Sequence, residues 1–352
     1  IFIAKRKSTI MEKIVDINSI EKIIDGPLVD RFGRKFNYLR LAVNEYCNLR
    51  CIYCMPETGA AFKAEDRLLT KNEFCKIIKI MSNLGVSKIR FTGGEPLAHK
   101  DLLYLIEFTR LKTDISSIHL TTNGILLPRY IKQLESNGIS GVNISLDTLE
   151  EEKFQKITRR KGLNKVLEGL QLAIDSQIKS IKVNVVVMRE FNNNEIIKFA
   201  ELTKLNDITV RFIELMPFDS HQIWKTGKFY RAEQMVKDLK LNYSSLLSIN
   251  GSSTEYYSFK IKNYKGKVAV IPAYTRSLCG ACNRIRITAD GSLLNCLYTQ
   301  SETNIREAIR KGMSERGVSE LIKKAMKEKL KDGKIAQLQG NEKRESMTQI
   351  GG

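Results

Sequence analysis

Six of the seven cysteines fall into two groups of three that lie far apart in the chain. In chain order they are Cys47, Cys51, Cys54, Cys279, Cys282 and Cys296. Three thiolates are one fewer than a closed tetrahedral zinc site or a fully ligated four-iron cluster requires. A four-iron cluster held by three thiolates keeps one iron open for a small molecule. The spacing therefore predicts two clusters that bind two different small molecules.

Structural zinc is the alternative for both groups. The first group, C-x3-C-x2-C, has no fourth cysteine or histidine nearby, which makes it a poor zinc site. The second group, C-x2-C-x13-C, leaves zinc or a purely structural cluster open when it is read alone. However, Arg284 and Arg286 lie just past Cys282, and alternate residues of a strand share one face. Two guanidiniums beside an open metal favour a site for phosphate.

The composition indicates a soluble globular protein with no membrane segment. Of 352 residues, 42% are hydrophobic and 28% are charged, and no apolar run approaches the roughly 20 residues of a membrane-spanning helix. An odd number of cysteines and a charged N-terminus argue against disulfides and a signal peptide, so we expect a cytoplasmic protein. The net charge of +19 is consistent with a polyanionic partner, but a lysine-rich solvated surface explains it better. We expect no nucleic-acid partner.

Short apolar runs alternate with helical patterns between residues 37 and 216, which predicts an α/β fold built from six βα units. The six expected strands are Tyr38–Val43, Lys88–Thr92, Ile118–Asn123, Gly141–Leu146, Ile181–Met188 and Ile208–Met216. Three segments follow: an N-terminal extension (1–36), a partial barrel (37–216) and a C-terminal domain (217–352) that carries the second cysteine group. We expect an incomplete (β/α)6 TIM-type barrel whose mouth is closed by the smaller C-terminal domain.

One face of each expected strand is polar, which is unusual for a barrel whose interior is filled with branched apolar side chains. The alternation places Arg40, Arg90, Thr121, Lys182, Lys88 and Arg211 on one face. Burying so many cations without partners would be prohibitive. The pattern therefore predicts a wet or ligand-filled cavity that binds an anion. Edge strands with one solvated face are the alternative.

The first cysteine group, with Tyr53 before its last cysteine, resembles the signature of the radical S-adenosylmethionine (SAM) superfamily. The second expected strand runs into TGGEP, which matches that superfamily's Gly-Gly-Glu-Pro motif. Two glycines allow close backbone approach to the methionine moiety of SAM, and Glu95 offers a carboxylate for its amino group.

From about Leu28 to Gly352 the chain resembles the GTP 3′,8-cyclase family, which begins molybdenum cofactor biosynthesis. The matching segments are IRFTGGEPL, TTNG, ISLDTL, ITRRKG, RFIELMP, CNRIRITADG and the terminal QIGG. The resemblance implies two [4Fe-4S] clusters, each held by one cysteine group, with SAM on the first and the guanine base of GTP on the second. It implies conversion of GTP to (8S)-3′,8-cyclo-7,8-dihydroguanosine 5′-triphosphate through a 5′-deoxyadenosyl radical.

The same resemblance implies particular site residues. Those that contact SAM are Tyr53, Gly94, Glu95, Ser145 and Met216. Those that bind GTP are Arg40, Arg90, Thr121, Lys182, Arg284, Ile285 and Arg286. Those with a catalytic role are Arg284, Arg286, Gly351 and Gly352.

The resemblance also implies partners: a flavodoxin- or ferredoxin-type electron donor, and a companion cyclic pyranopterin monophosphate synthase that takes the product. The oligomeric state is left open, with a homodimer as one option. The alternative enzyme is a radical SAM peptide maturase with an auxiliary cluster. The non-enzyme alternative is a basic, zinc-bearing protein that binds nucleic acid.

Overall fold

One twelve-stranded sheet runs through the residues that this computed structural model describes, which are 26–216, 226–251, 257–276, 279–299, 303–333, 335–336 and 346–351. Its strand order is β12-β11-β10-β1-β2-β3-β4-β5-β6-β9-β8-β7. The strands from β10 to β9 run parallel, and antiparallel strands complete both edges.

The first six strands form the expected βα core. They are β1 (Tyr38–Ala42), β2 (Lys88–Thr92), β3 (Ser117–Thr122), β4 (Gly141–Ser145), β5 (Ser180–Val187) and β6 (Thr209–Glu214). Their ends differ from the sequence prediction by no more than about two residues, which is the usual uncertainty of an element boundary. The helices between them are α1 (Lys71–Asn83), α2 (Leu102–Lys112), α3 (Leu127–Ser136), α4 (Glu151–Thr158), α5 (Leu163–Asp175) and α6 (Ile196–Glu201). The α/β partial barrel is confirmed.

The later part of the chain extends both edges of the same sheet. Its strands are β7 (Leu246–Ser248), β8 (Tyr257–Ile261), β9 (Lys267–Ile271), β10 (Arg284–Ile287), β11 (Ser292–Leu294) and β12 (Thr303–Asn304). Its longer helices are α7 (Ala232–Asn242), α8 (Ile305–Arg310) and α9 (Glu315–Lys327). Because β10 pairs with β1 and β9 with β6, these residues flank the core on two sides. The boundaries at residues 36 and 216 stay a prediction, and residues 1–25 and 217–225 lie outside the described part.

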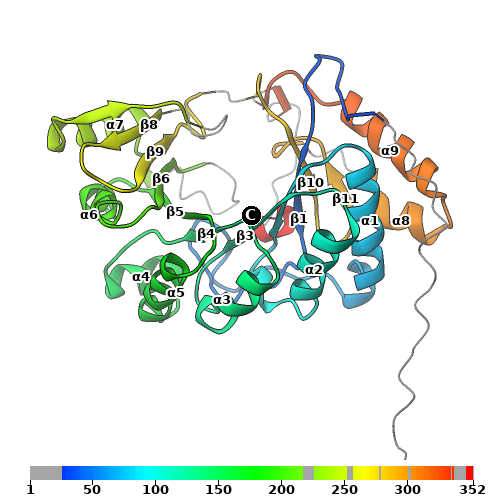
Figure 1. Ribbon diagram of the computed structural model, residues 1–352, viewed down its shortest axis with the longest axis horizontal. Coiled ribbons are helices and arrows are strands. Elements are labelled where there is room, and N and C mark those ends of the chain that lie inside the picture. The colour runs from blue at the N-terminus through cyan, green and yellow to red at the C-terminus, as the bar shows by residue number, and fades with distance from the viewer. Residues whose placement is uncertain are drawn as a thin grey trace, which may run out of the picture.

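The sheet is strongly curved. In Figure 1 it bends from β11 on one side to β8 on the other, with α1 to α6 along its outer face and the C-terminus on its inner side. No helix among the described residues is long and apolar enough to cross a membrane.

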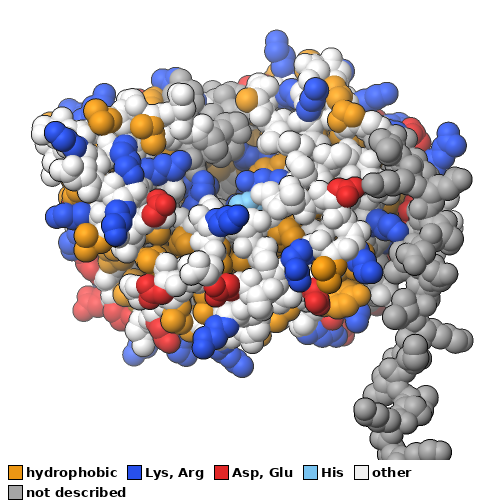
Figure 2. All heavy atoms as spheres, viewed as in Figure 1, with side chains coloured by type: hydrophobic (Ala, Val, Ile, Leu, Met, Phe, Trp, Pro, Cys, Tyr) orange, Lys and Arg blue, Asp and Glu red, His pale blue; other side chains and the backbone are white. Residues whose placement is uncertain are grey.

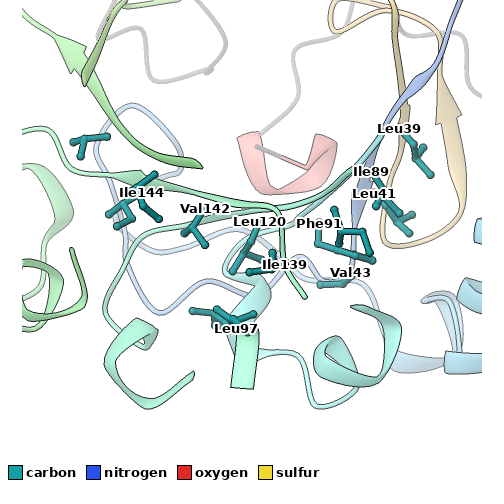
Figure 3. Close-up of a cluster of buried hydrophobic side chains, with 14 of the residues drawn as sticks. Leu39, Leu41, Val43, Ile89, Phe91, Leu97, Leu120, Ile139, Val142 and Ile144 are labelled. Atoms are coloured by element: carbon teal, nitrogen blue, oxygen red, sulfur yellow. The ribbon is translucent and has the colours of Figure 1, made fainter. Parts of the chain in front are cut away.

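The hydrophobic core lies between the sheet and these outer helices. Leu39 and Leu41 of β1, Ile89 and Phe91 of β2, and Leu120 of β3 are fully buried there. Figure 3 shows these side chains on one side of the sheet and the C-terminal segment, whose ribbon is pink, on the other. Each such side chain stabilises the fold by about 1.5–3 kcal/mol when removed from water. Because side chains alternate across a strand, packing this face leaves the residues between them on the inner face.

Candidate active site

Both cysteine groups line one cavity. Its volume is ≈ 490 Å³, and its walls include all six predicted ligands, Cys47, Cys51, Cys54, Cys279, Cys282 and Cys296. Residues from the carboxyl ends of β1 to β6 form the inner wall, as expected for a parallel βα fold. Segments far apart in the sequence thus contribute thiols to a common space.

The loop that carries the first cysteine group is anchored to the end of α4. The Arg50 amide donates to the Thr158 carbonyl at 2.9 Å. Arg159, in the left-handed region with φ 55°, donates from Nη1 to the carbonyls of Arg50 and Met55, each at 3.1 Å. The ITRRKG segment therefore holds in place the loop that carries the first cysteine group.

All six cysteines are free thiols, and thiolates are the ligands that hold iron–sulfur clusters. Among the described residues, no three His, Cys, Asp or Glu side chains converge as ligands of a single metal ion would. A four-iron cluster instead spreads its thiolates over separate irons. Burial raises the pKa of the Cys47 thiol to about 11, and it raises the pKa of Cys51 well above its usual range. A bound cluster would supply the positive charge that favours the thiolate forms.

The two glycines after β2 allow two chain segments to pack closely. A Cβ atom on Gly94 would lie 2.2 Å from the Tyr46 carbonyl oxygen, and one on Gly93 would lie 2.6 Å from that of Asn44. The Gly94 amide donates to the Asn44 carbonyl at 3.0 Å. The two glycines therefore approach the backbone that follows β1 closely. This packing places Gly94 in the cavity wall.

Glu95 is the predicted SAM position that lies outside the cavity lining. Its carboxylate is fully buried and does not line the cavity. It accepts hydrogen bonds from the Asn123 amide at 2.7 Å, the Thr122 hydroxyl at 2.8 Å and the Leu97 amide at 3.0 Å. Burial raises its pKa to about 7 despite these donors. The side chain thus ties the loop after β2 to the end of β3.

The other four predicted SAM positions, Tyr53, Gly94, Ser145 and Met216, all line the cavity together with the first cysteine group. Tyr53 donates its hydroxyl to Asp147 at 2.6 Å, and Asp147 also accepts from the Val186 amide at 2.7 Å. Burial raises the pKa of Asp147 to about 6, although both hydrogen bonds lower it. Asp147 thereby fixes the tyrosine ring beside the first cysteine group.

A row of arginines crosses the cavity wall between the cysteine groups. Arg40 on β1 is the register partner of Arg90 on β2 and of Arg286 on β10. Thr121, Arg211 and Arg284 line the same cavity. Burial, and then the neighbouring Arg284, lower the pKa of Arg286 to about 10. Figure 2 shows many Lys and Arg side chains on the face that contains the central hollow.

Tyr38 supports this row and was missed in the sequence prediction. Its hydroxyl accepts from Arg90 Nε at 2.6 Å, and Lys88 Nζ lies 5.0 Å from its ring centroid. Burial alone would raise the tyrosine pKa, but Arg90, Arg40 and Lys88 lower it to about 7. Because Tyr38 lies two residues before Arg40 on β1, strand alternation could have identified it.

Four predicted positions in the described part of the chain are not among the residues that line the cavity: Glu95, Lys182, Ile285 and Gly351. Lys182 on β5 is in register with Asn143 and Thr209, but it is not among the lining residues. The side chain of Ile285 is fully buried in the hydrophobic core. Gly352 lies outside the described residues.

The C-terminal segment enters the site from the inner side. The Met347 amide donates to the Cys54 carbonyl at 3.0 Å, and Arg40 Nη2 donates to the Gly351 carbonyl at 3.4 Å. Gly351 has a φ of +77°, and a Cβ atom there would lie 2.9 Å from the Thr92 hydroxyl oxygen. The segment thus connects the first cysteine loop with the arginine row.

Comparisons with known proteins show which families the chain resembles. Residues 41–203 match the radical SAM superfamily, and residues 208–335 match Molybdenum Cofactor Synthesis C. The chain is 42% identical to the GTP 3′,8-cyclase of Chlorobaculum tepidum, covering 92% of this chain and 97% of that protein. It is 41% identical to molybdenum cofactor biosynthesis protein 1 of Homo sapiens, covering 84% of this chain and 46% of that protein. The chain therefore spans about half of this longer relative.

Solved structures show the same fold at low sequence identity. A structure of anSMEcpe with bound AdoMet has a TM-score of 0.56 and 16% identity, covering 86% of this chain and 83% of that one. SuiB of Streptococcus suis bound to S-adenosylmethionine has a TM-score of 0.53 and 15% identity, covering 77% and 64%. The relatives that are more than 30% identical over nearly their full length establish that this chain belongs to the GTP 3′,8-cyclase family of radical SAM proteins.

Proposed function

We propose that the protein is a GTP 3′,8-cyclase that carries out the first step of molybdenum cofactor biosynthesis. The observation that carries the proposal is the single cavity that both cysteine groups share, with an arginine row between them. A radical generated beside one cysteine group would act on a substrate held by the other only if the two lie in one enclosed space. The named relatives support the same activity.

The first cysteine group would hold a [4Fe-4S] cluster with SAM, against Tyr53, Gly94, Ser145 and Met216. When bound, this cofactor pair supplies the radical chemistry that removes a hydrogen atom from the substrate. The protein's own contribution is to orient the two ligands and exclude water. Tyr53, held by Asp147, keeps a fixed aromatic wall at this end of the cavity.

The second cysteine group would hold a second [4Fe-4S] cluster, which would bind the guanine base through its open iron. The triphosphate would be bound by Arg40, Arg90, Arg284 and Arg286, because planar guanidiniums bind phosphate oxygens with charge-assisted hydrogen bonds. Charge compensation by the substrate also explains how so many buried arginines are tolerated on neighbouring strands. A role for the Lys182 side chain would require it to move toward the cavity.

The electron donor of flavodoxin or ferredoxin type, the companion synthase, the cytoplasmic location and the homodimer stay predictions. The alternative of a peptide maturase rests on fold likeness to proteins such as SuiB, which is 15% identical. A row of buried arginines favours a polyphosphate over a neutral peptide segment. GTP is therefore the better-supported substrate.

The test is anaerobic incubation of the reconstituted protein with SAM, GTP and a chemical reductant, followed by mass analysis. We expect 5′-deoxyadenosine and a cyclised nucleotide to accumulate together, and about eight irons per chain if both clusters load. ATP in place of GTP is the control, since it keeps the triphosphate and changes the base. Equal SAM cleavage with and without GTP, and no cyclised nucleotide, would rule the proposal out.

A further inference from the structure

Lys329 is a buried cation that lacks a carboxylate partner among the described residues. Its exposure is 3%. Its ammonium group donates to the Asn295 carbonyl and lies 5.6 Å from the centroid of the Phe36 ring. A carbonyl and a ring face provide partial negative charge only, and a buried ammonium needs a stronger counter-charge to remain ionised. The fold therefore provides an anion site beside Lys329.

The second cysteine group surrounds this position. Asn295 directly precedes Cys296, and Lys329 lines the same cavity as all three cysteines of the group. Four residues after Lys329, the Gly333 amide donates to Cys279 Sγ at 3.1 Å. A Cβ atom on Gly333 would lie 3.2 Å from that sulfur, so the segment packs tightly against the cysteine.

Arg34 holds the same segment in place from the other side. Its Nη1 donates to the carbonyls of Cys279 at 2.9 Å and Lys331 at 3.0 Å, and its Nη2 donates to that of Leu330 at 2.8 Å. Asp30 orients the guanidinium through Arg34 Nε at 2.6 Å. Residues 329–333 are thus fixed to the loop that carries the second cysteine group, and Lys329 has little freedom to turn away.

We propose that Lys329 is the charge partner of the second cluster and raises its reduction potential. The inference rests on the proposed function, in which Cys279, Cys282 and Cys296 hold a four-iron cluster. One-electron reduction adds a negative charge to a cluster that already carries three thiolates. A fixed ammonium nearby stabilises the reduced form more than the oxidised form. The Gly333 amide, as a hydrogen-bond donor to a ligand sulfur, acts in the same direction.

The test compares K329M with K331M in full-length, anaerobically reconstituted protein. Both variants remove one lysine charge from the same segment, but Lys331 is exposed. A redox titration monitored by EPR measures the midpoint potential of the second cluster. Its signal is identified as the one that does not change when SAM is added. We expect a more negative midpoint for K329M, an unchanged midpoint for K331M and a midpoint close to that of the wild type for K329R. Loss of about four irons in K329M alone, restored in K329R, would also support the charge partnership.

Two results would overturn the inference. One is a wild-type midpoint in K329M with full iron content. The other is a raised KM for GTP in K329M without any change in midpoint, which would make the triphosphate the partner of Lys329. About four irons in the wild type would contradict the proposed second cluster itself, whereas about eight irons with an unchanged midpoint would contradict this inference alone.

Discussion

Arg40 and Arg286 lie side by side as register partners on adjacent parallel strands, although one belongs to the first strand of the core and the other to a strand from the last third of the chain. Both side chains line the cavity. The two guanidiniums on neighbouring strands repel each other, and desolvation lowers the pKa of both. Their juxtaposition is favourable when an anion lies between them.

Removing one of these charges should lower the affinity for GTP without lowering the thermal stability of the protein. We expect R286M to be at least as resistant to thermal unfolding as the wild type without ligand, because a like-charge contact is lost. GTP affinity should fall about tenfold to a hundredfold, since a charge-assisted hydrogen bond contributes about 1.5–3 kcal/mol. Melting curves with and without GTP, together with calorimetric titration, measure both effects. The control is R129M, which changes an exposed arginine on α3 and should alter neither thermal stability nor GTP affinity. An R286M variant that is destabilised but binds GTP normally would contradict the account.

Glu95 should contribute to stability in a pH-dependent way. Its pKa is raised to about 7 in the folded protein, above its ordinary value, so the folded state holds the proton more tightly. This contribution is complete below the unfolded pKa and is lost as pH rises through about 7. Urea unfolding between pH 5 and 8 should therefore show a decline in wild-type stability that E95Q lacks.

The same variant tests where the carboxylate points. At neutral pH, E95Q should also be less stable by about 1–3 kcal/mol, because an amide cannot accept hydrogen bonds at both of its ends. E107Q, an exposed glutamate on α2, is the matched control. Unchanged stability with a large loss of SAM affinity would restore the original expectation that Glu95 contacts SAM.

Gly351 can be compared with a glycine of the same backbone conformation. Gly351 has φ +77° and Gly312 has φ +78°, so alanine at either position should cost about 1–2 kcal/mol of local strain. Only at Gly351 would the new methyl group meet Thr92 and Ala42, each at 2.9 Å, whereas nothing lies within 4 Å at Gly312. Product formation should fall about a hundredfold in G351A and stay near the wild type in G312A. Equal activity losses, measured by product mass, would refute a role for the C-terminal segment in the cavity.

Local pattern was enough to predict the core of the fold. The short apolar runs identified all six core strands, and the alternation along each strand identified its inner face. These features depend on residues that are neighbours in sequence. The same alternation placed Arg40, Arg90 and Thr121 on the inner face, where they line the cavity.

Long-range packing limited the prediction of the site. Arg34 reaches Cys279 across almost the whole chain, and Lys329 becomes buried through Phe36, so neither contact has a local signal. The GGEP motif singled out Glu95, but spacing alone does not say which way a carboxylate points. Its direction is set by the amides after β2 and β3, which become neighbours only when the sheet forms.

The central claim is that a radical formed at the first cysteine group acts directly on GTP held by the second, within one cavity. GTP carrying deuterium at the ribose C3′ tests this most directly, in a single anaerobic turnover with SAM and reductant. We expect mass analysis to find the deuterium in 5′-deoxyadenosine, formed in equal amount to the cyclised nucleotide. Deuterium retained in the nucleotide, or 5′-deoxyadenosine formed without label, would contradict the claim.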